Sequence, residues 1–272
     1  LERGSVDAIV SGHTHSAVAT VVNGIPIVQA RSSGRAIGIV DVPAQGPAVL
    51  PVVRAVVSDS LPPDPAVDSL VRAAEAAVAA RVSAVVAEAT EDLPRRGDQY
   101  ALGNLIADAQ RAAGAGDVAV MNNGGIRTDL RSGPVTWGDV YEVQPFANRL
   151  VAVTLPGRAL RKYLEALVAG RGIRYHVSGV TLTFDPAAPA GSRLREVTMN
   201  DGRPLDDRRR YRLVMTDFLV AGGDGAALGP EAVVDELGVI DLDVLVNHLR
   251  AQRGGQLTPT PSQRAARIRP LP

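Results

Sequence analysis

The chain has 272 residues, a formal net charge of zero and no cysteine. This length is enough for one large domain, or two, with a substantial hydrophobic core. The balanced charge disfavours a nucleic acid polymer as a partner, and no stretch approaches the roughly 20 apolar residues of a membrane span. The absence of cysteine excludes disulfides, thiolate catalysis and zinc–thiolate sites.

Short apolar runs in the first quarter of the chain predict strands, because they are rich in β-branched residues. They span residues 8–10, 25–30, 36–42 and 50–57. Asn23-Gly24 predicts a tight hairpin turn. The chain begins with Leu1 and reaches its first apolar run before residue 10, which indicates entry into the middle of a domain. We therefore expect any targeting signal to lie upstream.

The hydrophobic period changes after a proline-rich stretch, Pro62, Pro63 and Pro65. From Pro65 to about Thr90, alanine, valine and leucine recur at helical spacing, with charged residues mostly on the other faces. We predict one long amphipathic helix here, and we expect it to connect two domains.

Beyond Pro94 the pattern is mixed α/β. Thr136 and Asp139 resemble a capping box before a short helix. The Pro-rich tail from Gly254 is expected to be loose, although residues 266–268 could add a final strand. Further helices are expected at 101–113, 158–169 and 242–250, and strands at 118–121, 150–155, 180–184, 194–199 and 211–216.

Gly12-His13-Thr14-His15 directly follows a short apolar strand. Extended residues two apart point the same way, so the imidazoles of His13 and His15 can converge on one or two metal ions. The alternative is two surface histidines in a loop, but the strand context favours metal ligands. A hydrolytic two-metal centre needs several more ligands. His176 and His248 have no ligand-like neighbours in the sequence, and we interpret both as ordinary residues.

A second motif, Asn122-Asn123-Gly124-Gly125-Ile126-Arg127, follows an expected strand. Paired glycines expose backbone N–H groups and allow a ligand to approach closely. Arg127 adds a planar, permanently charged donor fork that suits phosphate. Taken alone, the motif slightly favours the alternative of a Gly-Gly turn with a solvated arginine.

Two of the three phenylalanines, Phe146 and Phe218, lie beside Gly- or Asn-rich loops. Aromatic faces from separate loops can sandwich a planar base, and Asp224 between two glycines can accept hydrogen bonds from a ribose diol. The alternative places both phenylalanines in the core and makes Asp224 a turn residue. For any one of these residues alone, the alternative is at least as good.

Taken together, these stretches resemble the bacterial and animal 5'-nucleotidase family, which includes UDP-sugar hydrolases and 2',3'-cyclic nucleotide phosphodiesterases. The matching segments occur in the family's order and cover most of the chain: residues 12–15, 101–109, 122–127, 145–146 and 217–225. The resemblance implies an α/β fold in three parts. These are the C-terminal end of a calcineurin-like metallophosphoesterase β-sandwich in residues 1–60, a linker helix in residues 61–92, and a complete mixed α/β nucleoside-binding domain in residues 93–270.

The resemblance also implies roles for individual residues. His13 and His15 would be metal ligands. The substrate-binding residues would be Asn122 and the stacking Phe146 and Phe218 at the base, Asp224 at the ribose hydroxyls, Arg127 at the phosphate and sugar, and Gly124 and Gly125 in the same loop. The family has a further arginine shortly before the Leu-Gly-Asn motif. Arg95 and Arg96 are displaced towards the N-terminus from that position, and Arg96 is taken as the candidate.

The family's upstream metal-binding motifs have no counterpart before Leu1. We therefore expect this chain to be N-terminally truncated and inactive alone. The intact parent is expected to hydrolyse nucleoside monophosphates with two divalent metal ions of the Mn or Zn type. The alternatives are a non-catalytic nucleoside-binding module, or a hydrolase of UDP-sugars or 2',3'-cyclic nucleotides. The resemblance implies an extracellular, periplasmic or cell-surface location, while the oligomeric state and the preferred base stay open.

Overall fold

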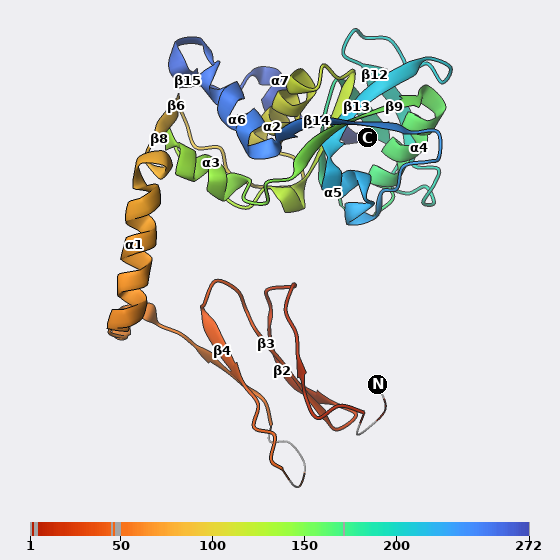
Figure 1. Cartoon of the computed structure of the whole chain (residues 1–272). Helices are drawn as coiled ribbons and strands as arrows, with labels where there is room; N and C mark the ends of the chain where they lie inside the picture. The colour runs from red at the N-terminus through yellow and green to blue at the C-terminus, as the bar shows by residue number, and fades with distance from the viewer. Residues whose placement is uncertain (1, 3–4, 45, 47–49, 171, 272) are drawn as a thin grey trace. The chain divides into compact units, whose positions relative to one another are not determined.

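The computed structural model describes residues 2, 5–44, 46, 50–170 and 172–271. The chain divides into two compact units, Leu1–Glu75 and Ala76–Pro272 (Figure 1). Within the described ranges, no helix combines the length and the apolar character needed to cross a lipid bilayer.

The first unit contains two small sheets. In one of them, β3 (Ile25–Ala30) is the middle strand. It pairs antiparallel with β2 (Ala17–Val22) and parallel with β1 (Ile9–Val10). β4 (Ala36–Ile39) pairs with β5 (Val52–Ala55), and a short 3₁₀ helix, η1, spans Ser58–Ser60.

The predicted hairpin turn at Asn23-Gly24 is confirmed. Val22 lies opposite Ile25, so the turn has two residues, and their φ angles are 53° and 77°. Positive φ at both central positions is typical of the two-residue turns whose twist matches that of the flanking strands.

Helix α1 (Pro65–Val82) begins where the periodicity predicts, but the expected extension to Thr90 is wrong. Residues Val85–Ala89 instead form strand β6. This strand pairs antiparallel with β8 (Gly133–Thr136) and parallel with β15 (Gln256–Leu257). The partners are distant in sequence, so the helical spacing of local apolar residues could not reveal them.

The second unit is built on a mixed five-stranded sheet with the order β10-β7-β13-β9-β14. β7 and β13 are parallel, and the other neighbours are antiparallel. The strands are β7 (Val118–Asn122), β9 (Arg149–Pro156), β10 (Tyr175–Ser178), β13 (Arg210–Thr216) and β14 (Val233–Ile240).

Helices cover both faces of this sheet (Figure 1). Val118 and Val120 of β7 share a core with α4 (Gly157–Val168). Ala119 and Met121 point to the opposite face, where α2 (Ala101–Ala113) and α6 (Asp241–Arg250) pack. Both faces are therefore buried, which explains why β7 is a continuous apolar run.

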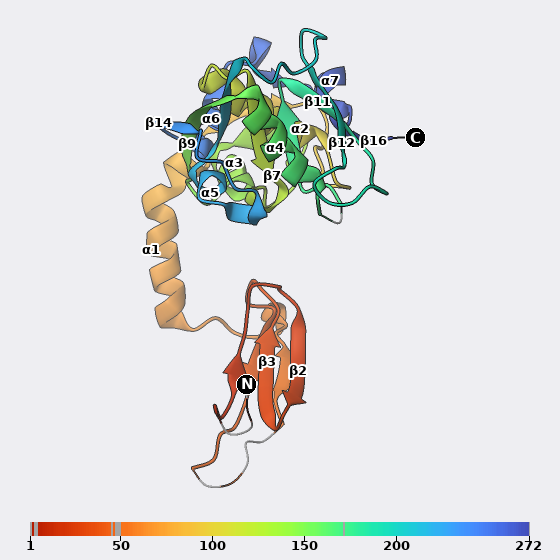
Figure 2. The same cartoon turned by 90° about the vertical axis from the view of Figure 1, so that its right-hand side faces the viewer.

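The remaining elements border this core. The capping box of Thr136 and Asp139 is confirmed at the start of α3 (Trp137–Val143). A second sheet has the order β12 (Leu194–Met199), β11 (Val180–Phe184) and β16 (Ile268–Pro270), and Figure 2 shows it close to the C-terminus. Short helices complete the unit: η2 (Asn123–Gly125), α5 (Asp217–Val220), η3 (Gly223–Gly225), η4 (Arg253–Gly255) and α7 (Pro261–Arg264).

The prediction that the tail from Gly254 is loose is wrong, because it forms β15, α7 and β16. The alternative of a final strand near residues 266–268 agrees with β16, which begins at Ile268. The amide Nδ2 of Asn104 in α2 donates to the carbonyl oxygens of Gln263 (2.8 Å) and Ala265 (3.1 Å). The guanidinium of Arg267 donates to both carboxylate oxygens of Asp108, at 2.6 and 3.0 Å. Tertiary hydrogen bonds thus order a segment whose composition favours loops.

Candidate functional site

The strand order brings three of the sequence motifs to one edge of the five-stranded sheet. β7 and β13 are parallel neighbours, so the loops that follow them start at the same edge. β9 runs antiparallel to β13, with Leu150 opposite Thr216, so residues 144–148 enter β9 from this edge as well. In α/β sheets such an edge, at the carboxyl ends of parallel strands, commonly binds ligands.

Asn122 and Asp224 meet at this edge although they belong to different motifs. Asn122 is 4% exposed at the end of β7, and its Nδ2 donates a hydrogen bond of 2.6 Å to Asp224 Oδ2. Asp224 is an exposed residue in η3 with a left-handed φ of 58°. The link leaves an exposed carboxylate held at a defined place at the edge of the sheet.

The two glycines after β7 lie close to the Asn122 side chain. A Cβ at Gly125 would lie 2.6 Å from Met121 Cε and 3.0 Å from Asn122 Oδ1. A Cβ at Gly124 would lie 3.3 Å from Asn122 Nδ2. Larger residues at these positions would push against the Asn122 amide.

Phe146 and Phe218 are 54% and 45% exposed, so neither ring is a buried core anchor. The guanidinium carbon of Arg127 lies 5.6 Å from the ring centroid of Phe146. A Cβ at Gly223 would lie 2.4 Å from Phe218 Cε1, so this ring packs directly against the glycine backbone. Exposed aromatic surface at such an edge is suited to stacking on a planar group.

Arginines border the loop that follows β7. Arg127 Nη1 donates to the Gly124 carbonyl at 3.2 Å. Arg95 reaches the same loop, donating from Nη1 to the Arg127 carbonyl (3.3 Å) and from Nη2 to the Asn123 carbonyl (3.5 Å). Arg96 is exposed. Of the two adjacent arginines, the structure therefore connects Arg95 to the loop, whereas Arg96 was the predicted one.

His13 and His15 lie in the first unit, between β1 and β2, and both are exposed. Their φ angles are 66° and 56°, so the extended conformation that we assumed for them is wrong. The Thr14 N–H donates to the Gly12 carbonyl (2.8 Å), which closes a tight turn centred on His13. The described residues contain no group of three or more His, Cys, Asp and Glu side chains able to hold a metal ion.

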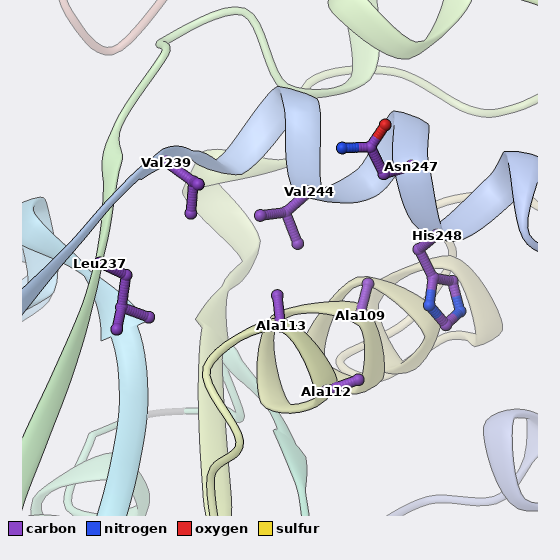
Figure 3. A pocket seen from close by; sticks show the side chains of 8 residues that line it. All are labelled: Ala109, Ala112, Ala113, Leu237, Val239, Val244, Asn247 and His248. Carbon is purple, nitrogen blue, oxygen red and sulfur yellow. The ribbon is translucent and has the colours of Figure 1, made fainter.

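The other two histidines lie in β10 and α6. His176 is fully buried, and its Nδ1 lies 3.1 Å from Asn104 Oδ1. His248 lines a cavity of about 370 Å³, which Figure 3 shows between α2, α6 and β14. Apart from His248 and Asn247, the residues lining this cavity are alanine, valine and leucine, so it offers little chemistry for hydrolysis.

Sequence analysis missed Tyr175, which also lies at the site. Its hydroxyl donates to the Asp224 carbonyl oxygen at 2.9 Å. β10 has only four residues, Tyr175–Ser178, and was not predicted. The alternation of a strand this short is a weak signal, and the pairing of Tyr175 with Asn122 is visible only in the sheet register.

The fold and the loops define a mixed α/β domain with an edge suited to a small ligand that has a planar group. The sequence model described as "5'-nucleotidase, C-terminal domain" matches residues 80–229, and the chain belongs to this family.

Three similar proteins extend this finding. The chain is 34% identical over 259 residues to endonuclease YhcR of Bacillus subtilis, covering 90% of this chain and 21% of that protein. It is 28% identical over 280 residues to cell wall protein Lmo0130 of Listeria monocytogenes, with coverages of 92% and 36%. The solved structure of a 5'-nucleotidase precursor from Thermus thermophilus is 28% identical, with a TM-score of 0.74 and coverages of 97% and 59%. The chain therefore spans less than two thirds of each.

Proposed function

We propose that the second unit binds the nucleoside part of a nucleotide, and that the whole protein hydrolyses nucleotide phosphoesters as a 5'-nucleotidase does. The observation that carries this proposal is the Asn122–Asp224 hydrogen bond beside two exposed phenylalanines at one sheet edge. Membership of the 5'-nucleotidase C-terminal domain family supports it.

Each side chain then has a distinct task. Phe146 and Phe218 stack on the base, and Asn122 contacts it. The carboxylate of Asp224 accepts hydrogen bonds from the ribose hydroxyls, because an ionised carboxylate is a pure acceptor. The phosphate is taken by Arg127 together with Arg95 or Arg96, since guanidinium groups suit phosphate oxygens. Gly124 is exposed and leaves the backbone open to the ligand. Gly125 is buried, and its missing side chain makes room for Met121 and Asn122.

Two divalent ions of the Mn or Zn type are part of the proposed chemistry of the whole protein, with His13 and His15 among their ligands. Both imidazoles are exposed and of a suitable donor type. Two donors are fewer than the three or four protein ligands of a zinc site, and no larger group occurs in the described residues. The residues present do not complete a metal site, so we propose that this chain alone does not hydrolyse nucleotides.

We also propose the domain assignment, namely a metallophosphoesterase remnant in residues 1–60, a linker in 61–92 and a substrate-binding domain in 93–270. A location outside the cytoplasm is proposed as well, supported by the relative named a cell wall protein.

Calorimetric titration of the chain with adenosine, uridine and AMP tests the binding function. We expect Phe218→Ala to weaken binding by roughly 5- to 100-fold, the loss expected when one stacking partner of a base is removed. Tyr141→Ala is the matched control, because Tyr141 is also 45% exposed but stacks on Trp137. Unchanged affinity in Phe218→Ala would contradict the base-stacking role.

Phosphate release from AMP, in the presence of Mn²⁺ or Zn²⁺, tests the catalytic part. We expect no metal-dependent release from this chain. Metal-dependent release would refute the proposed inactivity of this chain. Cleavage of a polynucleotide is assayed in parallel because one relative is named an endonuclease.

A further inference from the structure

Tyr175 and Asn122 lie directly opposite each other on the paired strands β10 and β7. Opposite residues of an antiparallel pair place their side chains on the same face of the sheet. The Tyr175 hydroxyl donates to the Asp224 main-chain oxygen (2.9 Å), and the Asn122 amide donates to Asp224 Oδ2 (2.6 Å). Tyr175 thus holds the backbone of Asp224, and its cross-strand neighbour Asn122 holds the carboxylate.

The loop around Asp224 needs such support. Asp224 has a φ of 58°, between Gly222 at 88° and Gly225 at 85°. A residue other than glycine adopts this left-handed conformation at a cost, and it persists only where the surroundings hold it. Glycines on either side allow the turn but do not by themselves restrain it.

Tyr175 is well placed to provide a fixed restraint. The residue is 4% exposed, and its ring packs in the core shared by the sheet and α4. Burial, together with the charge of Asp224, raises the pKa of the Tyr175 hydroxyl. The hydroxyl therefore stays protonated and remains a donor at neutral pH.

We propose that Tyr175 is a positioning residue that fixes the Asp224 carboxylate and so gives the site its preference for a ribose 2',3'-diol. The proposal rests on the role given above to Asp224 at the ribose hydroxyls. The Tyr175 hydroxyl contacts the loop at the Asp224 main-chain oxygen, so its effect should depend on the hydroxyls that Asp224 binds.

The same core offers a matched control. Tyr163 is 2% exposed, and its hydroxyl faces Met215 Sδ at 3.8 Å. Tyr163→Phe removes the same atom from the same hydrophobic cluster as Tyr175→Phe. It leaves both hydrogen bonds to Asp224 in place.

The test is calorimetric titration of the full chain and the two variants with adenosine and with 2',3'-dideoxyadenosine. We expect Tyr175→Phe to weaken adenosine binding by about 3- to 10-fold, the effect of one lost hydrogen bond. Its affinity for dideoxyadenosine should stay at the wild-type value, and Tyr163→Phe should change neither affinity. An equal loss for both nucleosides, or no loss for adenosine, would overturn the proposal.

A second measurement separates this inference from the proposed function. If the wild-type chain binds neither nucleoside, the function proposed above fails. Amide hydrogen exchange over residues 222–226 then decides whether Tyr175 holds the loop. Faster exchange in Tyr175→Phe but not in Tyr163→Phe supports the positioning role, and equal exchange in both variants refutes it.

Discussion

Gly103 in the interior of α2 leaves room for a buried imidazole. A Cβ at this position would lie 2.2 Å from His176 Nε2, and the ring is fully buried. Tyr100 packs edge-on against the same ring, with the centroids 4.5 Å apart, and Asn104 Oδ1 lies 3.1 Å from its Nδ1. The Leu-Gly-Asn stretch, identified through its family resemblance, therefore has a structural task around His176.

The buried His176 makes the stability of the protein depend on pH. Burial, and to a lesser degree the charge of Arg267, lowers the pKa of His176 to about 3, from 6.5 when unperturbed. Between these values the unfolded state binds more protons than the folded state, so the free energy of unfolding falls as the pH decreases from 6.5 towards 3. We expect His176→Gln to remove this pH dependence, which amounts to about 1 kcal/mol of unfolding free energy per pH unit. Urea unfolding of both proteins at several pH values measures it.

The unfolding free energies of the wild type and His176→Gln are best compared above the pH range in which Asp108 titrates. Burial raises the pKa of Asp108, but hydrogen bonds from Arg267, Ser178 and Gln263 outweigh this and hold it below its ordinary value of 3.8. Asp108 therefore adds its own loss of stability only as the pH falls below that value. If the variant and the wild type keep the same slope between about pH 4 and pH 6.5, His176 does not carry the effect.

The C-terminal segment is held by a side-chain network on α2 and β10. Arg267 is 8% exposed and places its guanidinium on Asp108, with a further hydrogen bond of 2.9 Å to the Val177 carbonyl. Asp108 also accepts from the Ser178 hydroxyl at 2.6 Å. This network lets a Pro-rich segment contribute a helix and two strands to the unit.

Arg267→Ala should weaken the whole second unit, because it leaves the partly buried Asp108 carboxylate without its main partner. We expect the free energy of unfolding to fall by about 3 kcal/mol, as measured by urea unfolding. Arg264→Ala is the control on the same segment. Its ion pair with Glu91 is 46% and 40% exposed, and we expect a loss below about 1 kcal/mol. Equal losses in the two variants would contradict the assigned network.

The two units of the molecule differ in how much they bury. In the described part of the first unit, the buried residues are Ile25, Pro26, Val28, Gln29 and Pro51. Val10 and Leu50 are 82% and 72% exposed there. The second unit has three clusters of buried apolar residues around its central sheet. Because apolar burial is the main stabilising term, the second unit should be much the more stable.

Amide hydrogen exchange, followed by mass spectrometry, measures this difference directly. We expect the amides of β2 and β3 to exchange at least about 100-fold faster than those of β7 and β13, since strands with few buried contacts open locally at low cost. β9 serves as an internal reference because it is paired on both sides in the five-stranded sheet. Similar protection in the two units would show that the first unit is stabilised by more than its buried residues indicate.

Local signals predicted local structure well. The Asn23-Gly24 turn, the capping box at Thr136 and the helix at Ala101–Ala113 all form as the residues indicate. Each depends on atoms a few residues apart. The failures include strand β6, predicted as helix, and the tail after Gly254, predicted as loose. Both form through partners far away in the sequence, whose hydrogen bonds outweigh local preference.

The amino-acid sequence was sufficient to predict the family and the mixed α/β class, because ordered motifs and hydrophobic periods are local properties of the chain. Three contacts became known only from the folded chain: Asn122 bonds to Asp224, Arg95 reaches the loop after β7, and Tyr175 supports the site. These contacts depend on the order and register of the central strands, which are set by long-range hydrogen bonds and by the packing of helices on both faces of the sheet.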